Sequence, residues 1–334
     1  MPFETGKKIL AALLLSFGVV PAAMAAGYAQ NPLARELMVE MQEEYGFTPE
    51  HLQQVFAKAR KQQSILDAIS RPAERVKPWK EYRPIFLTRQ RIDKGLQFWA
   101  ENEQALERAE QEYGVPAEFI VAIIGVETFY GGNTGRYKVL DALSTLAFDY
   151  PPRAPFFRGQ LKQFLLLTRE ERLEPSSLKG SYAGAMGMPQ FMPGSFRAYA
   201  VDFNEDDRIN IWTDAEDAIG SVANYFIEHG WQPGQQVVVR ASLKGEEAEQ
   251  GLTGGLEPKN SMRELRSLGW QPEQKVAART QVTAFRLEGE QGDEYWLGLP
   301  NFQAITRYNR SEMYAMAVTQ LAQVMANERK ESSK

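Results

Sequence analysis

The sequence predicts a mainly α-helical protein with a small α+β insert in its second half. Apolar residues recur at helical spacing through most of residues 28–229, as amphipathic helices require. Short runs typical of β-strands are concentrated at 237–239, 282–287 and 295–298, and a final helical pattern at 311–328 follows them. These observations predict a helical body that the chain leaves to form the insert and then rejoins.

Length and composition indicate a globular protein. The chain has 334 residues, of which 43% are hydrophobic and 24% are charged, which are ordinary proportions for a fold with a substantial core. The formal net charge of −5 provides no basic field to attract nucleic acid. We therefore expect no nucleic-acid partner, and a sugar polymer or a small molecule fits this charge better.

Residues 1–26 are typical of a signal peptide. Lys7 and Lys8 precede an apolar run, Pro21 ends it, and Ala-Met-Ala at 23–25 is a small-x-small cleavage pattern. An apolar run of about 12 residues is too short to span a bilayer, which takes about 20; the alternatives are an uncleaved amphipathic anchor or a buried helix. The chain has no cysteine to form a disulfide or carry a lipid. We expect a periplasmic protein without a membrane anchor.

The region 27–80 is expected to be mostly helical and amphipathic, with a second apolar pattern at 51–70. Prolines predict an extended connector over 71–84, after which a long charged helix is expected from 85 to about 110. The apolar face of the first helix carries Leu33, Leu37 and Met41.

Residues 81–232 are predicted to form the helical core. Its most apolar helix is expected at 116–129, because a proline opens it and two glycines at 131–132 stop it. This helix has almost no polar face and should be buried. The other predicted segments are helices at 156–167 and 216–229, the α+β insert at 233–300 and a C-terminal segment at 301–334 that packs back on the core.

Glu127 is the first candidate functional residue. It lies near the end of the apolar helix, directly before a glycine-rich turn. Loss of water disfavours a carboxylate and raises its pKa, so that a proton held near neutral pH can be donated to a glycosidic oxygen. The alternative is a glutamate at a helix end that points into water.

A second candidate segment, at 181–193, combines small residues, methionines and one glutamine. Its glycines permit close approach of a ligand to the main chain, and its methionine and aromatic side chains offer an adaptable apolar floor. A tight helix–loop crossing in the core is the alternative. The candidate binding residues here are Ser181, Tyr182, Met188, Gln190 and Phe191.

Together the two segments resemble the catalytic domain of lytic transglycosylases, which is a lysozyme-like helical fold. The fuller pattern includes residues 152–153, 217–225 and 308–309, and it resembles the lytic murein transglycosylase B family over nearly the whole chain after the signal peptide. The resemblance implies that Glu127 is the lone catalytic acid and base. It further implies that the sugar groove is lined by Ser181, Gln190, Tyr308 and Asn309, with Tyr82 and Arg153 as weaker matches.

The chemistry implied by this resemblance is non-hydrolytic cleavage of peptidoglycan glycan strands at the β-1,4 bond between MurNAc and GlcNAc, giving 1,6-anhydromuropeptides without an organic cofactor. One alternative is a hydrolytic muramidase, which needs a second carboxylate or a positioned water; Asp141 and Asp149 are the nearby candidates. The other alternative is an inactive peptidoglycan-binding protein. The mode of cutting and any cell-wall synthase or hydrolase partners stay open.

Residues 202–214 begin like a calcium loop, with oxygen-bearing side chains at positions 1, 3 and 5. Two positions depart from the pattern, because Asp207 stands where glycine is usual and Thr213 replaces a bidentate glutamate. The alternative is an Asx-rich turn in which Asp214 caps the next helix. A structural Ca²⁺ in the loop 202–217 would be held by Asp202, Asn204, Asp206, the backbone carbonyl of Arg208 and, as the resemblance suggests, Asp217.

Overall fold

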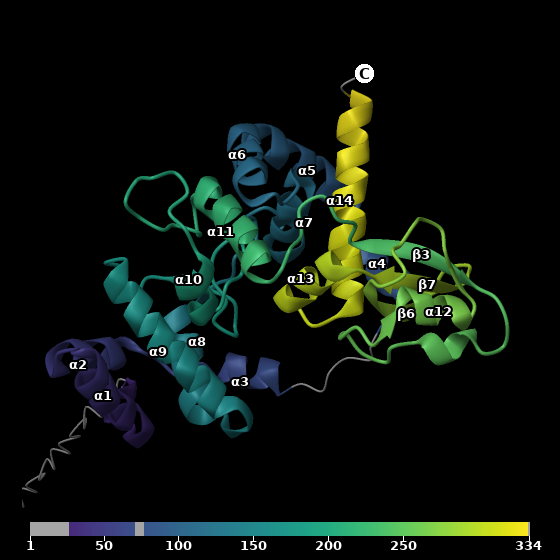
Figure 1. Ribbon diagram of the computed structural model, residues 1–334. Helices are drawn as coiled ribbons and strands as arrows, with labels where there is room; N and C mark the ends of the chain where they lie inside the picture. The colour runs from purple at the N-terminus through teal and green to yellow at the C-terminus, as the bar shows by residue number, and fades with distance from the viewer. Residues whose placement is uncertain (1–26, 71–76, 333–334) are drawn as a thin grey trace, which may run out of the picture.

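A computed structural model describes residues 27–70 and 77–332, and in this part of the chain a helical body carries a small sheet at one end (Figure 1). The predicted fold class, mainly α with a small α+β part, is confirmed. The predicted signal peptide lies outside the described residues. Across the two described stretches, every helix is too short or too polar to cross a bilayer.

The first group of helices packs around one hydrophobic cluster, at the left of Figure 1. Leu37 and Phe56 from the N-terminal helices meet Leu143 and Phe164 in this cluster, and all four side chains are fully buried. The N-terminal helices therefore dock on the body of the protein. The elements are η1 (Tyr28–Gln30), α1 (Pro32–Tyr45), α2 (Pro49–Lys58), α3 (Gln63–Ile69), α8 (Val139–Asp149), η2 (Pro151–Arg153), α9 (Ala154–Glu170) and α10 (Pro193–Tyr199).

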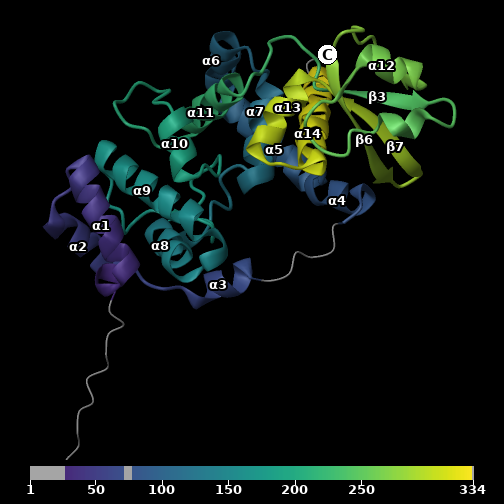
Figure 2. The ribbon, with the colours of Figure 1, turned by 60° about the horizontal axis from the view of Figure 1, so that its bottom comes forward.

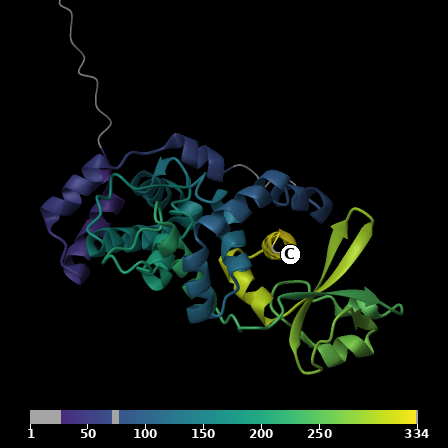
Figure 3. The same ribbon diagram turned by 90° about the horizontal axis from the view of Figure 1, so that it is seen from above.

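The second group of helices surrounds α7 (Ala117–Thr128), which is almost completely buried, as its apolar sequence predicts. The C-terminal helix α14 (Glu312–Ser332) packs directly against α7 and α5 (Arg89–Glu101). Figure 3 shows α14 end-on, between helices of this group and the sheet. The other members are α4 (Trp79–Phe86), α6 (Glu103–Tyr113), α11 (Ala215–Glu228) and α13 (Pro300–Tyr308).

Two helix predictions were wrong. An extended connector was expected at 71–84; residues 71–76 lie outside the described residues, but residues 79–84 are helical in α4 despite Pro84. Trp79 is 2% exposed, and its burial against the helical core offsets the cost of the proline. The single helix expected at 85–110 is two helices, α5 and α6, interrupted at Asn102, whose φ of −122° is not helical.

The insert is a five-stranded antiparallel sheet in the order β4-β6-β7-β3-β5, with α12 (Met262–Ser267) beside it. Figure 2 shows the sheet at the opposite end of the molecule from α1 and α2. Phe285 of the sheet stacks on Phe302 of α13, with ring centroids 5.0 Å apart, and so joins the insert to the helical body. The strands are β3 (Val238–Leu243), β4 (Asn260–Ser261), β5 (Trp270–Pro272), β6 (Gln281–Gly289) and β7 (Gly292–Gly298); η3 (Ala248–Gly251) lies between β3 and β4, and β1 (Tyr137–Lys138) pairs separately with β2 (Lys179–Gly180).

Candidate active site

Glu127 occupies the last turn of α7, where the helix ends in a strained turn. Phe129 and Tyr130 both adopt left-handed backbone conformations, with φ of 54° and 59°, which are uncommon for residues with large side chains. The Phe129 N–H donates to the carbonyl of Gly125 at 3.1 Å and closes the helix. Backbone strain of this kind is found at functional sites, where the surrounding structure enforces it.

Thr128 connects this turn to the second candidate segment. Its hydroxyl donates to the carbonyl of Met188 at 2.9 Å and accepts the N–H of Gly131 at 3.0 Å. Thr128 itself is 1% exposed, so both bonds are shielded from water and hold the segment firmly. Glu127 and Met188 are thereby fixed on neighbouring main-chain segments.

The hydroxyl of Tyr314 donates a hydrogen bond to Oε1 of Glu127 at 2.5 Å. Tyr314 lies in the first turn of α14, and the two residues are 187 positions apart in sequence. Tyr314 was not among the predicted site residues, and no motif marks it, because only the packing of α14 on α7 brings the two side chains together.

Burial raises the pKa of Glu127 to about 7, and the hydrogen bond from Tyr314 opposes this shift. The last turn of a helix also disfavours a negative charge, because the helix dipole is negative at that end. The predicted rise in pKa is therefore confirmed. Near neutral pH this group exists in both protonation states, as a residue that donates and then accepts a proton requires.

Three tyrosines lie within electrostatic influence of the carboxyl group. The negative charge of Glu127 raises the pKa of Tyr82, Tyr308 and Tyr314, in each case as a secondary cause after burial. Tyr308 donates its hydroxyl hydrogen to the carbonyl of Pro189 at 2.6 Å. Tyr82 and Tyr308, both predicted as site residues, therefore lie close to Glu127.

The segment 181–191 forms a compact loop beside this group. The hydroxyl of Ser181 accepts the N–H of Ala185 at 3.0 Å. Gln190 has a left-handed backbone, with φ of 52°, and its side-chain amide donates to the carbonyls of Thr134 and Gly187 at 3.2 and 2.9 Å. These bonds leave the side-chain carbonyl oxygen of Gln190 available to a ligand.

Phe191 differs from the other predicted binding residues. It is 2% exposed, and its ring packs on Tyr308 with centroids 6.0 Å apart. Phe191 was expected to line the groove, but its ring is buried and packs against Tyr308 instead. By contrast, Tyr182 is 43% exposed and available for contact.

Within residues 27–70 and 77–332, no contact links Arg153 or Asn309 to Glu127. The guanidinium of Arg153 lies over the rings of Phe156 and Phe157 at 4.6 and 5.3 Å. Asn309 ends α13 with an exposed side chain, although it directly follows Tyr308.

The two other carboxylates considered for catalysis have structural partners. Asp141 accepts the N–H of Arg60 and the side-chain amide of Gln62, both at 2.9 Å. Asp149 accepts a bond from Lys61 at 2.6 Å and another from the Tyr28 hydroxyl. Both carboxylates therefore hold the N-terminal helices in place.

The loop 202–214 places oxygen atoms together. The N–H of Asp206 donates to side-chain oxygens of both Asp202 and Asn204 at 3.1 Å, so these two oxygens converge. Asp207 adopts the left-handed backbone, with φ of 66°, that a calcium loop requires at this position.

Asp217 meets the expectation for this loop less well. It is fully buried and accepts backbone N–H bonds from Phe203, Asn204 and Asn210. Asp214 caps α11 by accepting the N–H groups of Glu216 and Asp217, so the helix-capping turn is also present. In the described ranges, no three His, Cys, Asp or Glu side chains are grouped as metal ligands.

Known proteins resemble this chain over most of its length. The family model of the transglycosylase SLT domain matches residues 29–323. Membrane-bound lytic murein transglycosylase B of Escherichia coli is 46% identical over 312 residues, covering 91% of this chain and 85% of that protein. Soluble lytic transglycosylase SltB1 of Pseudomonas aeruginosa is 60% identical, with a TM-score of 0.88 over 90% of this chain and all of that one.

Two further solved structures contain ligands. Lytic transglycosylase Slt35 of E. coli, in complex with calcium, is 46% identical, with a TM-score of 0.84 over 90% of this chain and 95% of that one. SltB3 of P. aeruginosa, in complex with NAG-anhNAM-pentapeptide, is 29% identical, with a TM-score of 0.79 over 87% of this chain and 78% of that one. The likeness to these structures confirms the predicted lysozyme-like fold class.

The fold and these similarities define an enzyme that acts on peptidoglycan, a lytic murein transglycosylase. Within that class, the chain belongs to the lytic murein transglycosylase B family.

Proposed function

We propose that this enzyme cleaves the β-1,4 bond between N-acetylmuramic acid and N-acetylglucosamine without water, with Glu127 as its single general acid and base. Protonated Glu127 donates its proton to the glycosidic oxygen as the bond breaks. The 2-acetamido group of the muramic acid stabilises the positive charge that develops on the sugar. The ionised Glu127 then takes the proton of the 6-hydroxyl of the same sugar, whose oxygen attacks the anomeric carbon and closes a 1,6-anhydro ring.

The environment of Glu127 is the observation that carries this proposal. A pKa of about 7 suits a group that must be an acid in one step and a base in the next. No carboxylate of the described residues shifts that pKa, and Asp141 and Asp149 are engaged elsewhere. The binding of an anhydro-muropeptide by the relative SltB3 supports the same product.

Mass spectrometry of the fragments released from purified peptidoglycan tests the proposal. The wild-type enzyme should release 1,6-anhydromuropeptides, and Glu127→Gln should lower the rate by about 10²–10⁴-fold, the usual contribution of a general acid or base. Asp141→Asn is the matched control and should give the same anhydro products. Wild-type products heavier by one water (about 18 mass units) would show a hydrolytic muramidase instead.

We also propose that a structural Ca²⁺ binds in the loop 202–217. The side-chain oxygens of Asp202, Asn204 and Asp206 and the carbonyl of Arg208 are the hard oxygen donors that calcium prefers. The left-handed backbone at Asp207 and the calcium complex of the relative Slt35 support this assignment. Asp217 would join them only by exchanging some of its backbone hydrogen bonds for the cation.

Thermal melting with and without Ca²⁺ tests the site. Ca²⁺ at about 100 times its Kd should stabilise the protein by about 3 kcal/mol, which is several degrees in Tm. Asp202→Ala should abolish this shift, whereas Glu205→Gln in the same loop should retain it. A wild-type Tm that is identical in Ca²⁺ and in chelator would exclude calcium binding.

Export to the periplasm without a lipid anchor is part of the same proposal. The basic and apolar pattern of residues 1–26 and the absence of cysteine support it, although the E. coli relative is named as membrane-bound. Glycan strands are the proposed partner, and cell-wall synthases or hydrolases are further candidates. Mass measurement of the protein from a periplasmic extract should reveal an unmodified chain that begins near residue 26.

A further inference from the structure

Two cations of α5 lie beside the turn that follows Glu127. The guanidinium carbon of Arg91 is 5.1 Å from the ring centre of Phe129, and the amine of Lys94 is 5.0 Å from the same ring. Arg91 also lies 5.2 Å from the ring of Phe86, so that its guanidinium is held between two aromatic side chains. Such cation–π contacts fix the position of a charge without neutralising it.

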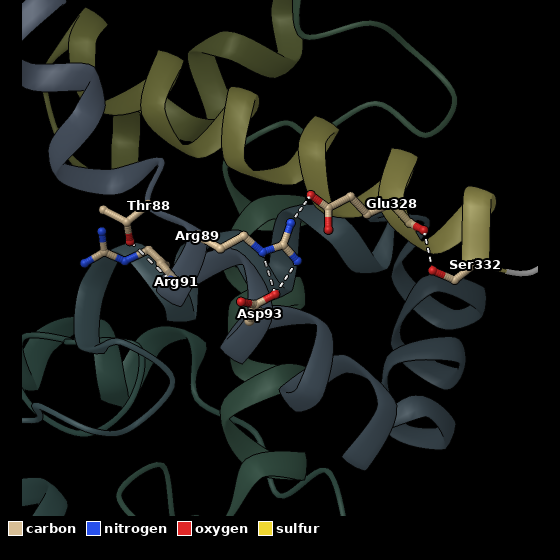
Figure 4. Close-up of polar contacts among 6 residues, drawn as sticks. All are labelled: Thr88, Arg89, Arg91, Asp93, Glu328 and Ser332. Atoms are coloured by element: carbon tan, nitrogen blue, oxygen red, sulfur yellow. Dashed lines mark hydrogen bonds and ion pairs between the residues drawn. The ribbon is translucent and has the colours of Figure 1, made fainter.

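No carboxylate within the described residues forms an ion pair with Arg91 or Lys94. The guanidinium of Arg91 donates one hydrogen bond within the described residues, to the carbonyl of Ile85 at 2.6 Å, and its Nε is buried with no partner in the same part of the chain. Figure 4 shows the contrast with Arg89 on the same helix, which contacts Asp93 and Glu328 while Arg91 points away from them.

A partly buried cation without a counter-ion is energetically unfavourable, because the charge loses water and gains no opposite charge in return. Burial accordingly lowers the pKa of Arg91. A protein can retain such an unpaired charge at a functional site, where a bound ligand supplies the opposite charge. Arg91 and Lys94 therefore have the properties of an anion site that is completed by its ligand.

The position of these cations relates them to the substrate. Phe129, which both contact, is two residues after Glu127. Phe86, the second ring against Arg91, packs on Tyr82 with ring centroids 5.1 Å apart, and Tyr82 is close enough for Glu127 to influence its charge. The cations thus border the same aromatic wall as the catalytic carboxyl group.

We propose that Arg91 and Lys94 form a subsite for a carboxylate of the peptide stem that muramic acid carries. The glycan strand cleaved at Glu127 has no other abundant anionic group, because its sugars are neutral once the lactyl carboxyl is amide-linked to the peptide. A fork-shaped guanidinium matches a carboxylate in geometry. The subsite rests on the proposed function at Glu127 for its substrate, but not on the anhydro product.

Kinetics on two soluble substrates test the subsite. One is glycan strands with intact peptide stems, and the other is the same strands with the stem carboxylates converted to neutral amides. The wild-type enzyme should prefer the first substrate, and its ratio of kcat/KM values should decrease as salt screens the charges. The double variant Arg91→Gln and Lys94→Gln should lower this ratio about tenfold, mainly through KM.

Arg89→Gln is the matched control, since Arg89 lies two residues before Arg91 on the same helix but is paired with Asp93 and Glu328, and its ratio should equal that of the wild type. Arg91→Lys should keep part of the preference that the double variant loses, because lysine keeps the positive charge. Comparing two substrates with one protein sample removes any effect of incomplete folding. A ratio that the double variant leaves unchanged would overturn the subsite. If the products were heavier by one water and the double variant still lowered the ratio, the result would support the subsite and reject the anhydro mechanism.

Discussion

Tyr314 adjusts the acidity of Glu127. Its hydroxyl hydrogen bond stabilises the carboxylate form, and so it lowers a pKa that burial raises. A carboxyl group that remained protonated far above neutral pH would donate its proton well but would not take one back in the second step. The tyrosine therefore balances the two roles that the proposed mechanism assigns to one residue.

Tyr314→Phe should displace the falling limb of the pH–kcat/KM profile to higher pH. The wild-type limb should lie near pH 7, because activity requires protonated Glu127 and declines as the pH rises through its pKa. Loss of a hydrogen bond to a charged group, about 1.5–3 kcal/mol, corresponds to a displacement of roughly one unit or more. A profile unchanged in position would show that Tyr314 does not act on Glu127.

The loop that carries Met188 and Gln190 depends on a close contact between main-chain segments. Gly187 has φ of 67°, and a Cβ at this position would lie 2.5 Å from the carbonyl oxygen of Ile211. The adjacent N–H of Met188 donates to that same oxygen at 2.8 Å. The loop 202–214, which contains Ile211, thus supports the segment 181–191 directly.

Gly187→Ala should reduce the free energy of unfolding by about 2–4 kcal/mol, from the left-handed backbone and the steric clash together. Activity should fall as well, because the clash displaces Met188. Gly159→Ala is the matched control: Gly159 lies in α9 with open space around its Cα, and alanine should add about 0.5–1 kcal/mol there. Chemical denaturation measures both, and equal stability of the two variants would contradict the argument.

Helices with a clear apolar period or with residues that mark their ends were predictable from sequence, and others were not. Residues 216–229 have such a period and correspond to α11, whereas residues 116–129 lack a polar face but are delimited by a proline and two glycines and correspond to α7. Helix α8 was missed because residues 139–148 are all buried and Lys138 at its N-cap is not a capping side chain.

The same limit applies to the candidate site. Glu127 was a candidate because it follows an apolar helix, and the resemblance to the transglycosylase family carried by the motifs around it singled it out. Tyr314 lies inside a helix predicted at 311–328, but its partner is 187 positions away and no local pattern encodes that contact. Phe191 belongs to a motif of the right composition, yet only packing reveals that its ring is turned into the core.

At the scale of the whole molecule, the site lies where two hydrophobic clusters meet. Tyr308 packs against the cluster around α7 and also against the cluster of the N-terminal helices. Tyr225 of the latter contacts Tyr308 at 4.6 Å between ring centres. Residues from both halves therefore fix the surroundings of Glu127.

The raised pKa of Glu127 should make the free energy of unfolding depend on pH. Below pH 4.5 it is protonated in both folded and unfolded chains and costs nothing. As pH rises to about 7 only the unfolded chain loses the proton, so stability falls by at most about 3 kcal/mol. Glu127→Gln should therefore raise the Tm at pH 8 and leave it nearly unchanged at pH 4. An equal effect at both pH values, measured by calorimetry, would refute this account.

The hydrogen bond between α7 and α14 has a consequence for the timing of biosynthesis. A chain elongating from its N-terminus contains Glu127 long before Tyr314, and all of the insert must be made in between. Until α14 has been synthesised and has packed on α7, Glu127 lacks both the Tyr314 hydroxyl, which lowers its pKa, and the helix that helps to bury it. The acid and base proposed at Glu127 therefore acquires its surroundings only when the last helix of the chain has folded, and an incomplete chain lacks them.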